Sequence, residues 1–315
     1  MRWKSRIRFL FLLPAVIWVL ALTIFPLGYS LYLAFYKVEQ KVEVKRVQEP
    51  VLDAGGKPVL DSQGRPRMKN VVIKEPVTTS TFVGLDNFAR LLEDPQVREA
   101  VRVTLVFVLV AVPLQLTLGF LLALLFNRHI MGRSVLRTMM ILPIFATPLA
   151  AGYVFFTIFY EAGGPLSWTG IPWLSSPRWA LFSVALVDTW QWTPFCFLVF
   201  LAALQGIPDD LYEAARIDGA SGFDLLFRVL LPLMVPTITI VLLIRLAEAL
   251  KLFDIPFALT GGGPGVATQP YSMLAFRTGL RFFDVGYASA MAYGLLAVVM
   301  VIITLFFRRM RETYA

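Results

Sequence analysis

Polar and aromatic side chains recur at helical spacing inside two long apolar stretches of the chain. The first set contains an acid, an amide and two aromatic residues: Asp188, Gln191, Trp192 and Phe195. The second set has the same i, i+3, i+4, i+7 spacing: Arg245, Glu248, Ala249 and Leu252. Residues with this spacing share one face of an α-helix. Because ionisable side chains are costly inside a membrane span, both faces are candidates for a functional site.

These residue types suit a solute that carries many hydroxyl groups. Carboxylate, amide and guanidinium groups bond hydroxyls, and aromatic rings cover the apolar faces of a sugar. Asp188 and Glu248 are negative and Arg245 is positive, and this slight negative excess disfavours an anionic solute such as a phosphate ester. We predict a solute site for a neutral sugar or polyol. A second interpretation stays open, in which Arg245 pairs with Glu248 or Asp188 to hold helices together. The two roles can coexist.

The composition places both faces in a membrane protein. Hydrophobic residues make up 57% of the chain and charged residues only 16%, whereas soluble domains average about a quarter charged residues. The formal charge of +8 is typical of basic cytoplasmic loops and does not favour a nucleic-acid partner. A single cysteine, Cys196, excludes an internal disulfide, and a single histidine, His129, leaves no cysteine and histidine cluster for a metal.

Six apolar stretches are long enough to cross a bilayer as helices, which takes about 20 residues each. They cover residues 9–36, 101–127, 135–160, 180–206, 229–252 and 285–307. We therefore predict an all-α integral membrane protein with a single transmembrane domain over 1–315. The first stretch is too long for a signal peptide, whose apolar core has about 7–15 residues, so we interpret it as a retained span.

Lys and Arg residues in the short connections predict that both termini are cytoplasmic. They gather before the first span, between the second and third spans, and after the sixth: Arg2, Lys4, Arg6, Arg8, Arg128, Arg133, Arg137, Arg308, Arg309 and Arg311. With six spans, all three groups fall on one side of the membrane. The segment 37–100 is then a large outer loop. Basic residues indicate membrane orientation only in loops shorter than about 60 residues, and this segment is near that length.

The outer segment contains a near-duplication. VLDAGGKP at 51–58 is followed at once by VLDSQGRP at 59–66, and their Gly and Pro residues suit turns between short extended pieces. The pattern favours either a small β-hairpin-like insertion or a mobile loop. Two interpretations of its role stay open, a docking function and a tolerated surface insertion.

In this topology the two polar faces reach the same depth. Gln191 lies sixteen residues from the inner end of its span near 207, and Arg245 lies sixteen residues from the inner end near 229. At a rise of 1.5 Å per residue, both lie about 24 Å from the inner boundary. We therefore expect the two faces to meet toward the outer half of the membrane.

The segment 208–232, between spans four and five, reads like part of a soluble protein. Pro208 and Asp209 mark a helix start and Gly219 a helix end, with apolar side chains on one shared side: Leu211, Ala214 and Ala215. A second short helix over about 221–229 leads into span five. The segment lies on the cytoplasmic side in this topology. Its surface is acidic, which disfavours contact with anionic lipid and favours a protein partner.

This segment resembles a known motif. The residues Glu213-Ala214-Ala215, Asp218-Gly219-Ala220, Arg228 and Leu231-Pro232 are similar, at this spacing, to the EAA loop of permease subunits of binding-protein-dependent ABC importers. Further stretches resemble the maltose-type sugar permeases: FVGLDNFARLL at 82–92, ILPIFATPLAAG at 141–152, DTWQWTPF at 188–195 and FDIPFALTGGGPG at 253–265. The resemblance covers nearly the whole chain except for about 37–80.

The resemblance implies a role for each region. The segment 208–232 would be a cytoplasmic coupling loop that docks on an ATPase subunit through Glu213, Ala214, Ala215, Asp218, Gly219, Arg228 and Pro232. Counted outward from Glu213 without gaps, the two polar faces fall where maltose-type permeases contact sugar. Several residue types differ there, notably Arg245 and Glu248. The implied partners are a second related permease, two ATPase subunits, an extracytoplasmic solute-binding protein, the sugar or polyol solute and membrane lipid, in the cell (inner) membrane of a prokaryote.

The chain itself contains no phosphate-binding loop of the form GxxxxGK[ST], because GGGPG at 261–265 lacks the following Lys and Ser or Thr. It favours a flexible or tightly turned outer loop instead. We therefore expect no cofactor on this chain and no catalytic residues, with ATP and Mg²⁺ on the partner ATPase. Alternative classes are a secondary transporter, which often shows internal repeats not found between these halves, a permease for a glycerophosphate-type solute, and a membrane-bound enzyme.

Overall fold

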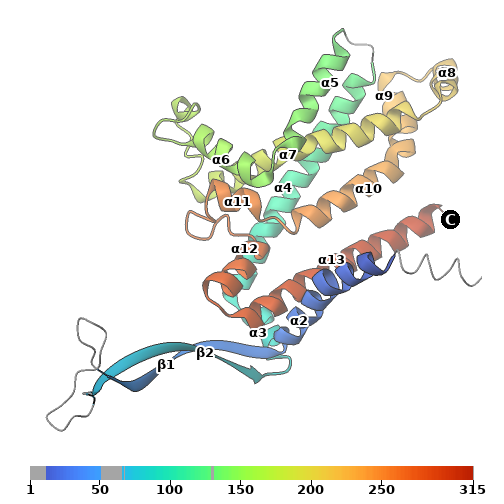
Figure 1. Cartoon of the computed structure of the whole chain (residues 1–315). Helices are drawn as coiled ribbons and strands as arrows, with labels where there is room; N and C mark the ends of the chain where they lie inside the picture. Colours follow the sequence, from blue (N-terminus) through green and yellow to red (C-terminus); the bar gives the residue numbers. More distant parts are fainter. Residues whose placement is uncertain (1–11, 51–65, 67, 129–130, 315) are drawn as a thin grey trace, which may run out of the picture. The chain divides into compact units, whose positions relative to one another are not determined.

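The computed structural model describes residues 12–50, 66, 68–128 and 131–314. The chain folds into two compact units. The first contains Met1–Arg90 and Arg277–Met291, and the second contains Leu91–Phe276 and Ala292–Ala315. The fold is mainly α-helical, with one two-stranded antiparallel sheet (Figure 1).

Five helices among the described residues are long and apolar enough to cross a membrane. They are Leu12–Ala34, Pro95–Phe126, Pro177–Gln205, Gly222–Leu250 and Val285–Arg308. A sixth span is formed if the bent pair Arg133–Phe145 and Pro148–Phe159 is counted as one. This confirms the predicted class of multi-span helical membrane protein. The basic residues before the first span lie outside the described residues, and the cytoplasmic position of both termini stays a prediction.

The third predicted span, 135–160, is not one straight helix. Helix α5 (Arg133–Ile141) runs into the 3₁₀ turn η2 (Leu142–Phe145), and α6 (Pro148–Phe159) then leaves at 101°. Thr147 is extended, with ψ 141°, because the ring of Pro148 disfavours helical geometry in the preceding residue. The Thr147 hydroxyl then accepts a hydrogen bond from the N–H of Ala150 at 3.4 Å and caps the new helix.

The second unit is built on the pair α4 (Pro95–Phe126) and α7 (Pro177–Gln205), against which α10 (Leu231–Ala249) packs (Figure 1). A Cβ atom placed on Gly119 of α4 would lie 2.5 Å from the Cβ of Cys196 on α7 and 2.9 Å from the backbone N of Phe197. The two backbones therefore approach closely, as small residues permit at helix contacts in membranes. Phe197, Phe200 and Leu204 fill the adjoining core.

The remaining elements complete the fold. Their bounds are η1 Leu20–Ile24, α2 Phe25–Ala34, α3 Asp86–Glu93, η3 Ser167–Thr169, α8 Asp209–Ile217, α9 Gly222–Asp224, η4 Leu225–Leu230, α11 Asp254–Leu259, α12 Tyr271–Phe276, η5 Arg277–Arg281 and α13 Val285–Tyr314. The GGGPG stretch at 261–265 is a tight turn. The hydroxyl of Thr268 donates to the carbonyl of Gly263 at 2.8 Å, and the hydroxyl of Thr260 accepts from the N–H of Gly262 at 3.2 Å.

The first unit carries the hairpin. Strand β1 (Tyr36–Pro50) pairs with β2 (Met68–Phe82) in an antiparallel register that runs from Tyr36 opposite Phe82 to Pro50 opposite Met68. Of the two predicted alternatives for the outer insertion, the structure shows the hairpin, with strands much longer than the short pieces expected. The duplicated stretch 51–66 lies outside the described residues except for Pro66.

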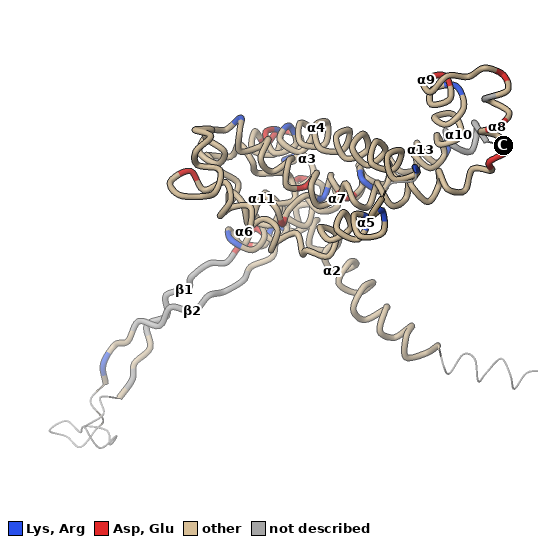
Figure 2. The backbone as a smooth tube through the Cα atoms, turned by 90° about the horizontal axis from the view of Figure 1, so that it is seen from above, with Lys and Arg blue, Asp and Glu red and all other residues tan. Residues whose placement is uncertain are grey.

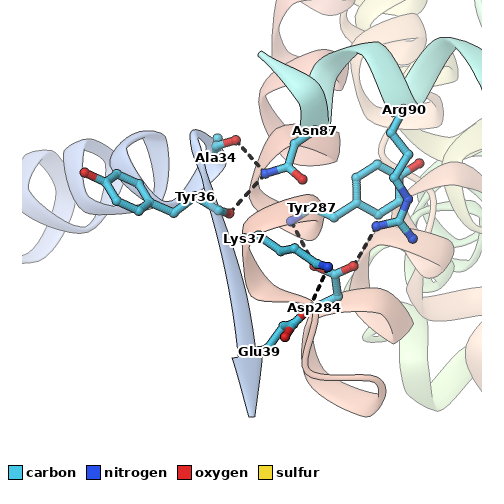
Figure 3. Close-up of polar contacts among 8 residues, drawn as sticks. All are labelled: Ala34, Tyr36, Lys37, Glu39, Asn87, Arg90, Asp284 and Tyr287. Carbon is cyan, nitrogen blue, oxygen red and sulfur yellow. Dashed lines mark hydrogen bonds and ion pairs between the residues drawn. The ribbon is translucent and has the colours of Figure 1, made fainter. Parts of the chain in front are cut away.

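Polar contacts fasten the base of the hairpin within the first unit (Figure 3). The buried amide of Asn87 donates to the carbonyls of Ala34 at 2.9 Å and Tyr36 at 3.0 Å, where α2 gives way to β1. Ala34 is the last residue of α2 and Tyr36 the first of β1, and a carbonyl at a helix end has no intrahelical donor. Arg90 donates to the carboxylate of Asp284 at 2.8 Å, and its guanidinium lies 3.8 Å from the centre of the Tyr287 ring.

Candidate functional site

A closed polar triangle lies at the centre of the second unit. Arg245 on α10 donates from Nε to the Oε1 of Gln115 on α4 at 2.8 Å and from Nη2 to the Oδ2 of Asp188 on α7 at 3.1 Å. The Nε2 of Gln115 donates to the same Asp188 oxygen at 2.6 Å. Arg245 is 1% exposed, Asp188 3% and Gln115 0%. The triangle therefore joins three membrane helices through side chains that are almost fully buried.

The burial of both charges determines what the triangle can do. An unpaired charge in this position would be strongly unfavourable, so each member depends on the others. One donor remains available, because among the described residues no group bonds the Nη1 of Arg245. The ring of Trp192 lies beside this guanidinium, with 4.5 Å between the Cζ of Arg245 and the ring centre. Such a distance gives a cation–π contact.

Gln191 provides a second buried polar group on α7. Its Nε2 donates to the carbonyl of Ala146 at 2.6 Å. That carbonyl is freed by the break between η2 and α6, so Gln191 ties the bend of the third span to α7. Its Oε1 is buried and has no partner among the described residues. A buried acceptor without a partner invites a donor from a solute or a water molecule.

A small pocket of about 90 Å³ opens beside the triangle. Its lining contains three acidic and two basic side chains: Asp188, Glu248, Asp254, Arg245 and Lys251. The remaining lining is mostly apolar: Pro148, Trp192, Leu252, Phe253 and Ile255. Lys251 pairs with Glu248 at 2.8 Å, with both side chains about half exposed. The formal charge of the lining is three negative against two positive, or −1.

The two predicted faces do meet, since Asp188 and Trp192 both contact Arg245. Five of the eight predicted solute residues line the pocket: Asp188, Trp192, Arg245, Glu248 and Leu252. Leu252 reaches it from a turn, because α10 ends at Ala249. Gln191, Phe195 and Ala249 are not among the lining residues. Of the two ion pairs considered for Arg245, the one with Asp188 is formed, and Glu248 pairs with Lys251 instead.

Sequence reasoning did not select Gln115, Lys251 or Asp254. Gln115 had a usable signal, because it is a polar residue in the middle of an otherwise apolar span. Lys251 and Asp254 follow α10 and gave no periodic signal. They reach the pocket because the chain turns after Ala249 and re-enters as α11.

The segment 208–232 forms a knob at the end of α7 remote from α6 and α11 (Figure 1). Helix α8 ends at Ile217, and Gly219 in the turn after it has a φ of +78°, in the left-handed region. The N–H of Ala220 donates to the carbonyl of Ala215 at 2.9 Å, which is the long bond of a Schellman motif. Gly219 is therefore required by the turn itself. Acidic and basic positions lie together on this connection (Figure 2).

Most predicted coupling residues on the knob are accessible. Glu213, Ala214, Asp218 and Gly219 are exposed, whereas Ala215 is buried. Arg228 is exposed and pairs with Asp224 at 3.3 Å. Large apolar side chains are exposed nearby: Ile217 is 85% exposed and Phe223 78%. Exposed apolar side chains with a charged surround are typical of a protein interface.

The second short helix predicted over 221–229 is not separate from span five. A continuous helix runs from Gly222 to Leu250, and its stretch η4 has π-helical bonding, with the N–H of Leu231 bonded to the carbonyl of Leu226. Pro232 follows at the start of α10. Because proline has no N–H for the usual i−4 carbonyl, a wider local turn lets the helix continue through it.

These features define a multi-span helical membrane protein with a buried polar site and an exposed knob. Residues 115–312 match the family described as "Binding-protein-dependent transport system inner membrane component". The chain belongs to this family. It is therefore a multi-pass inner-membrane component of a transport system that depends on a binding protein.

Individual relatives and structures agree. The chain is 37% identical to the trehalose/maltose transport system permease protein MalF of Thermococcus litoralis, over 70% of this chain and 76% of the relative. It is also 37% identical to the sulfoquinovosyl glycerol transport system permease protein SmoG of Agrobacterium fabrum, over 73% and 77%. In fold, it resembles a bacterial ABC transporter involved in the import of the acidic polysaccharide alginate, with a TM-score of 0.76 at 24% identity over 99% of both chains.

Proposed function

We propose that this permease imports a neutral sugar or polyol and that the pocket beside the Gln115–Asp188–Arg245 triangle is part of its solute site. The observation that carries the proposal is the lining of this pocket. The ring of Trp192 offers an apolar face and the carboxylate of Glu248 an acceptor. The Nη1 of Arg245, which is buried and has no partner among the described residues, offers a donor. This combination suits the C–H faces and hydroxyl groups of a sugar.

The charge of the pocket supports a neutral solute. The positive charge of Arg245 is balanced by Asp188, and that of Lys251 by Glu248. Asp254 leaves a formal charge of −1 in the lining. A phosphate or sulfonate would meet no uncompensated cation here and would gain little from binding. The relative named for trehalose and maltose transport supports the same class of solute.

The size of the pocket supports a second permease. Its volume of about 90 Å³ is well below the roughly 300–1,000 Å³ typical of small-molecule sites. A complete sugar site therefore needs walls from another chain. We propose a related permease subunit as the partner that closes the path, as implied by the family.

The knob supports an ATP-driven mechanism. The exposed Glu213 and the neighbouring apolar side chains would dock on a cytoplasmic ATPase subunit, which would hold ATP and Mg²⁺. Two such subunits would serve the two permeases. Closure of the ATPases would move α8, and the rigid turn at Gly219 would transmit this movement to the continuous helix 222–250 that carries Arg245. The solute site would then open alternately outward, toward the extracytoplasmic binding protein, and inward.

The test uses Trp192→Leu in the assembled transporter reconstituted in liposomes, with Trp190→Leu as the matched control. Trp190 is on the same helix, packs against Phe155 at 5.0 Å between ring centres, and does not line the pocket. We expect Trp192→Leu to lose uptake of a neutral disaccharide while basal ATPase activity persists. Trp190→Leu should retain uptake. Wild-type uptake by Trp192→Leu, or a wild-type preference for a phosphorylated solute such as a glycerophosphate, would contradict the assignment.

A further inference from the structure

A larger apolar groove lies on the second unit away from the solute pocket. It has a volume of about 590 Å³ and runs between α4 and α7. Apolar side chains line its floor and walls: Val106, Phe107 and Val110 from α4, and Leu181, Phe182 and Ala185 from α7. Val106 is 41% exposed and Phe182 40%, so the groove opens at the surface of this unit. Its volume falls within the range of about 300–1,000 Å³ for small-molecule sites.

The groove ends at a charged and aromatic mouth. Pro177, Arg178 and Trp179 lie in the first turn of α7 and complete the lining. Arg178 is exposed and forms no ion pair with any described residue. The Trp179 ring packs between Trp173 at 5.6 Å and Phe182 at 5.9 Å. The lining contains no acidic side chain, so its formal charge is +1.

The position of the groove along the helices matches one membrane surface. Counted from the knob end of α7 at Gln205, Ala185 lies twenty residues away and Arg178 twenty-seven. At 1.5 Å per residue these are about 30 and 40 Å, against a hydrocarbon thickness of about 30 Å. Arg178 then lies beyond the hydrocarbon, at headgroup level, and the α7 part of the apolar lining reaches down from it to the hydrocarbon boundary at Ala185. Tryptophan is common at this level, and arginine can anchor a helix there.

We propose that this groove binds a phospholipid with an anionic headgroup, whose phosphate contacts Arg178 and whose acyl chain lies against Val106, Val110 and Phe182. Guanidinium groups bind phosphate oxygens in pairs, and the net positive mouth favours an additional negative charge on the lipid. The groove lies at the end of α7 opposite the knob. In the proposed function the knob is cytoplasmic, so the groove faces the outer leaflet, and this choice of leaflet rests on the proposed function. The binding itself does not depend on which solute is transported.

The experiment reconstitutes the assembled transporter in liposomes of equimolar phosphatidylglycerol and phosphatidylcholine, extracts it gently and counts retained lipids by native mass spectrometry. We expect the wild type to retain phosphatidylglycerol several-fold over phosphatidylcholine. Arg178→Gln should lower this ratio toward one while a lipid is still retained. Val106→Trp should fill the groove and remove the lipid. Arg98→Gln is the matched control, because Arg98 is an exposed arginine on α4 outside the groove and should leave the ratio unchanged.

Three outcomes would overturn the proposal. They are a wild-type ratio of one, an unchanged ratio in Arg178→Gln, and lipid retention in Val106→Trp. A photo-crosslinker at position 182, in the wall of the groove, gives an independent readout. It should label lipid, and labelling of the second permease in its place would show that the groove is a protein interface. If the wild-type transporter retained phosphatidylglycerol as expected but did not take up a neutral disaccharide, the proposed function would be wrong and the lipid site would stand.

Discussion

The buried triangle makes Arg245 a strong determinant of stability. In Arg245→Gln, the carboxylate of Asp188 remains 3% exposed and keeps only the hydrogen bond from Gln115. Removing one partner of a buried ion pair typically costs about 3–5 kcal/mol, because the other charge stays buried and uncompensated. For a unit of the size of the second one, 1 kcal/mol corresponds to roughly 2–4 °C in Tm. We therefore expect Arg245→Gln to lower the Tm by about 6–20 °C.

A double variant separates charge from packing. Asp188→Asn combined with Arg245→Gln removes both charges and keeps side chains that can bond Gln115. Its Tm should be much closer to the wild type than the sum of the two single losses, because neighbouring sites are coupled. The assay is thermal unfolding in detergent, followed by near-UV circular dichroism, with Lys251→Gln as the control. Lys251 belongs to a half-exposed pair, and such pairs contribute about 0–1 kcal/mol.

The reasoning is refuted by either of two results. The first is a Tm for Arg245→Gln that equals that of Lys251→Gln. The second is a double variant whose loss equals the sum of the single losses. In both cases the Asp188 carboxylate would have to be protonated or hydrated in the folded protein, and the triangle would not hold the three helices together.

Three further predictions concern other parts of the molecule. Gly119→Val should destabilise the second unit by about 1–3 kcal/mol through overpacking against α7. Gly28→Ala is the control and should not destabilise the protein, because a Cβ at Gly28 meets nothing within 4 Å. Equal Tm values for the two variants would show that the helices can separate at no cost. Glu213→Lys should abolish solute-stimulated ATPase activity in the assembled transporter. It should not lower the Tm, because this side chain is exposed. Undiminished stimulation would contradict docking through α8. Burial acts to raise the pKa of Glu161, but the hydrogen bonds its carboxylate accepts from the N–H groups of Leu174 at 2.8 Å and Ser175 at 2.9 Å outweigh burial and lower this pKa. The stability that Glu161 contributes relative to Glu161→Gln should be complete above the ordinary glutamate pKa of about 4.3 and lost as the pH falls through the lower folded-state value; a pH-independent difference would contradict it.

Periodicity and composition were enough to predict several features of the fold and site. A run of about 20 apolar residues can satisfy its backbone in a membrane only as a helix, so the span positions followed directly from the sequence. The i, i+3, i+4, i+7 spacing fixed which side chains share a face, and equal counting from the inner ends brought Gln191 and Arg245 to one depth. The structure joins Arg245 to Asp188, which shares the face of Gln191, at 3.1 Å.

Other features depended on contacts that local patterns do not encode. The 101° bend in the third span and the π-helical turn before Pro232 follow from proline geometry, but their sizes are set by neighbours such as Gln191, which bonds the freed carbonyl of Ala146. The partner of Arg245 was ambiguous in sequence between Asp188 and Glu248. The structure selects Asp188, which is buried beside Gln115, whereas Glu248 lies near Lys251.

The sequence by itself therefore determined the class of protein, the helices and the faces they present, because these depend on local composition and on the 3.6-residue period. Only the tertiary structure decided which faces meet and which charges neutralise one another. It also showed that Gln115, which is 73 residues from Asp188 in the chain, completes the buried triangle. The physical reason is that a buried charge is tolerated only where its partners converge in space. That convergence is a property of packed helices and is absent from any single segment.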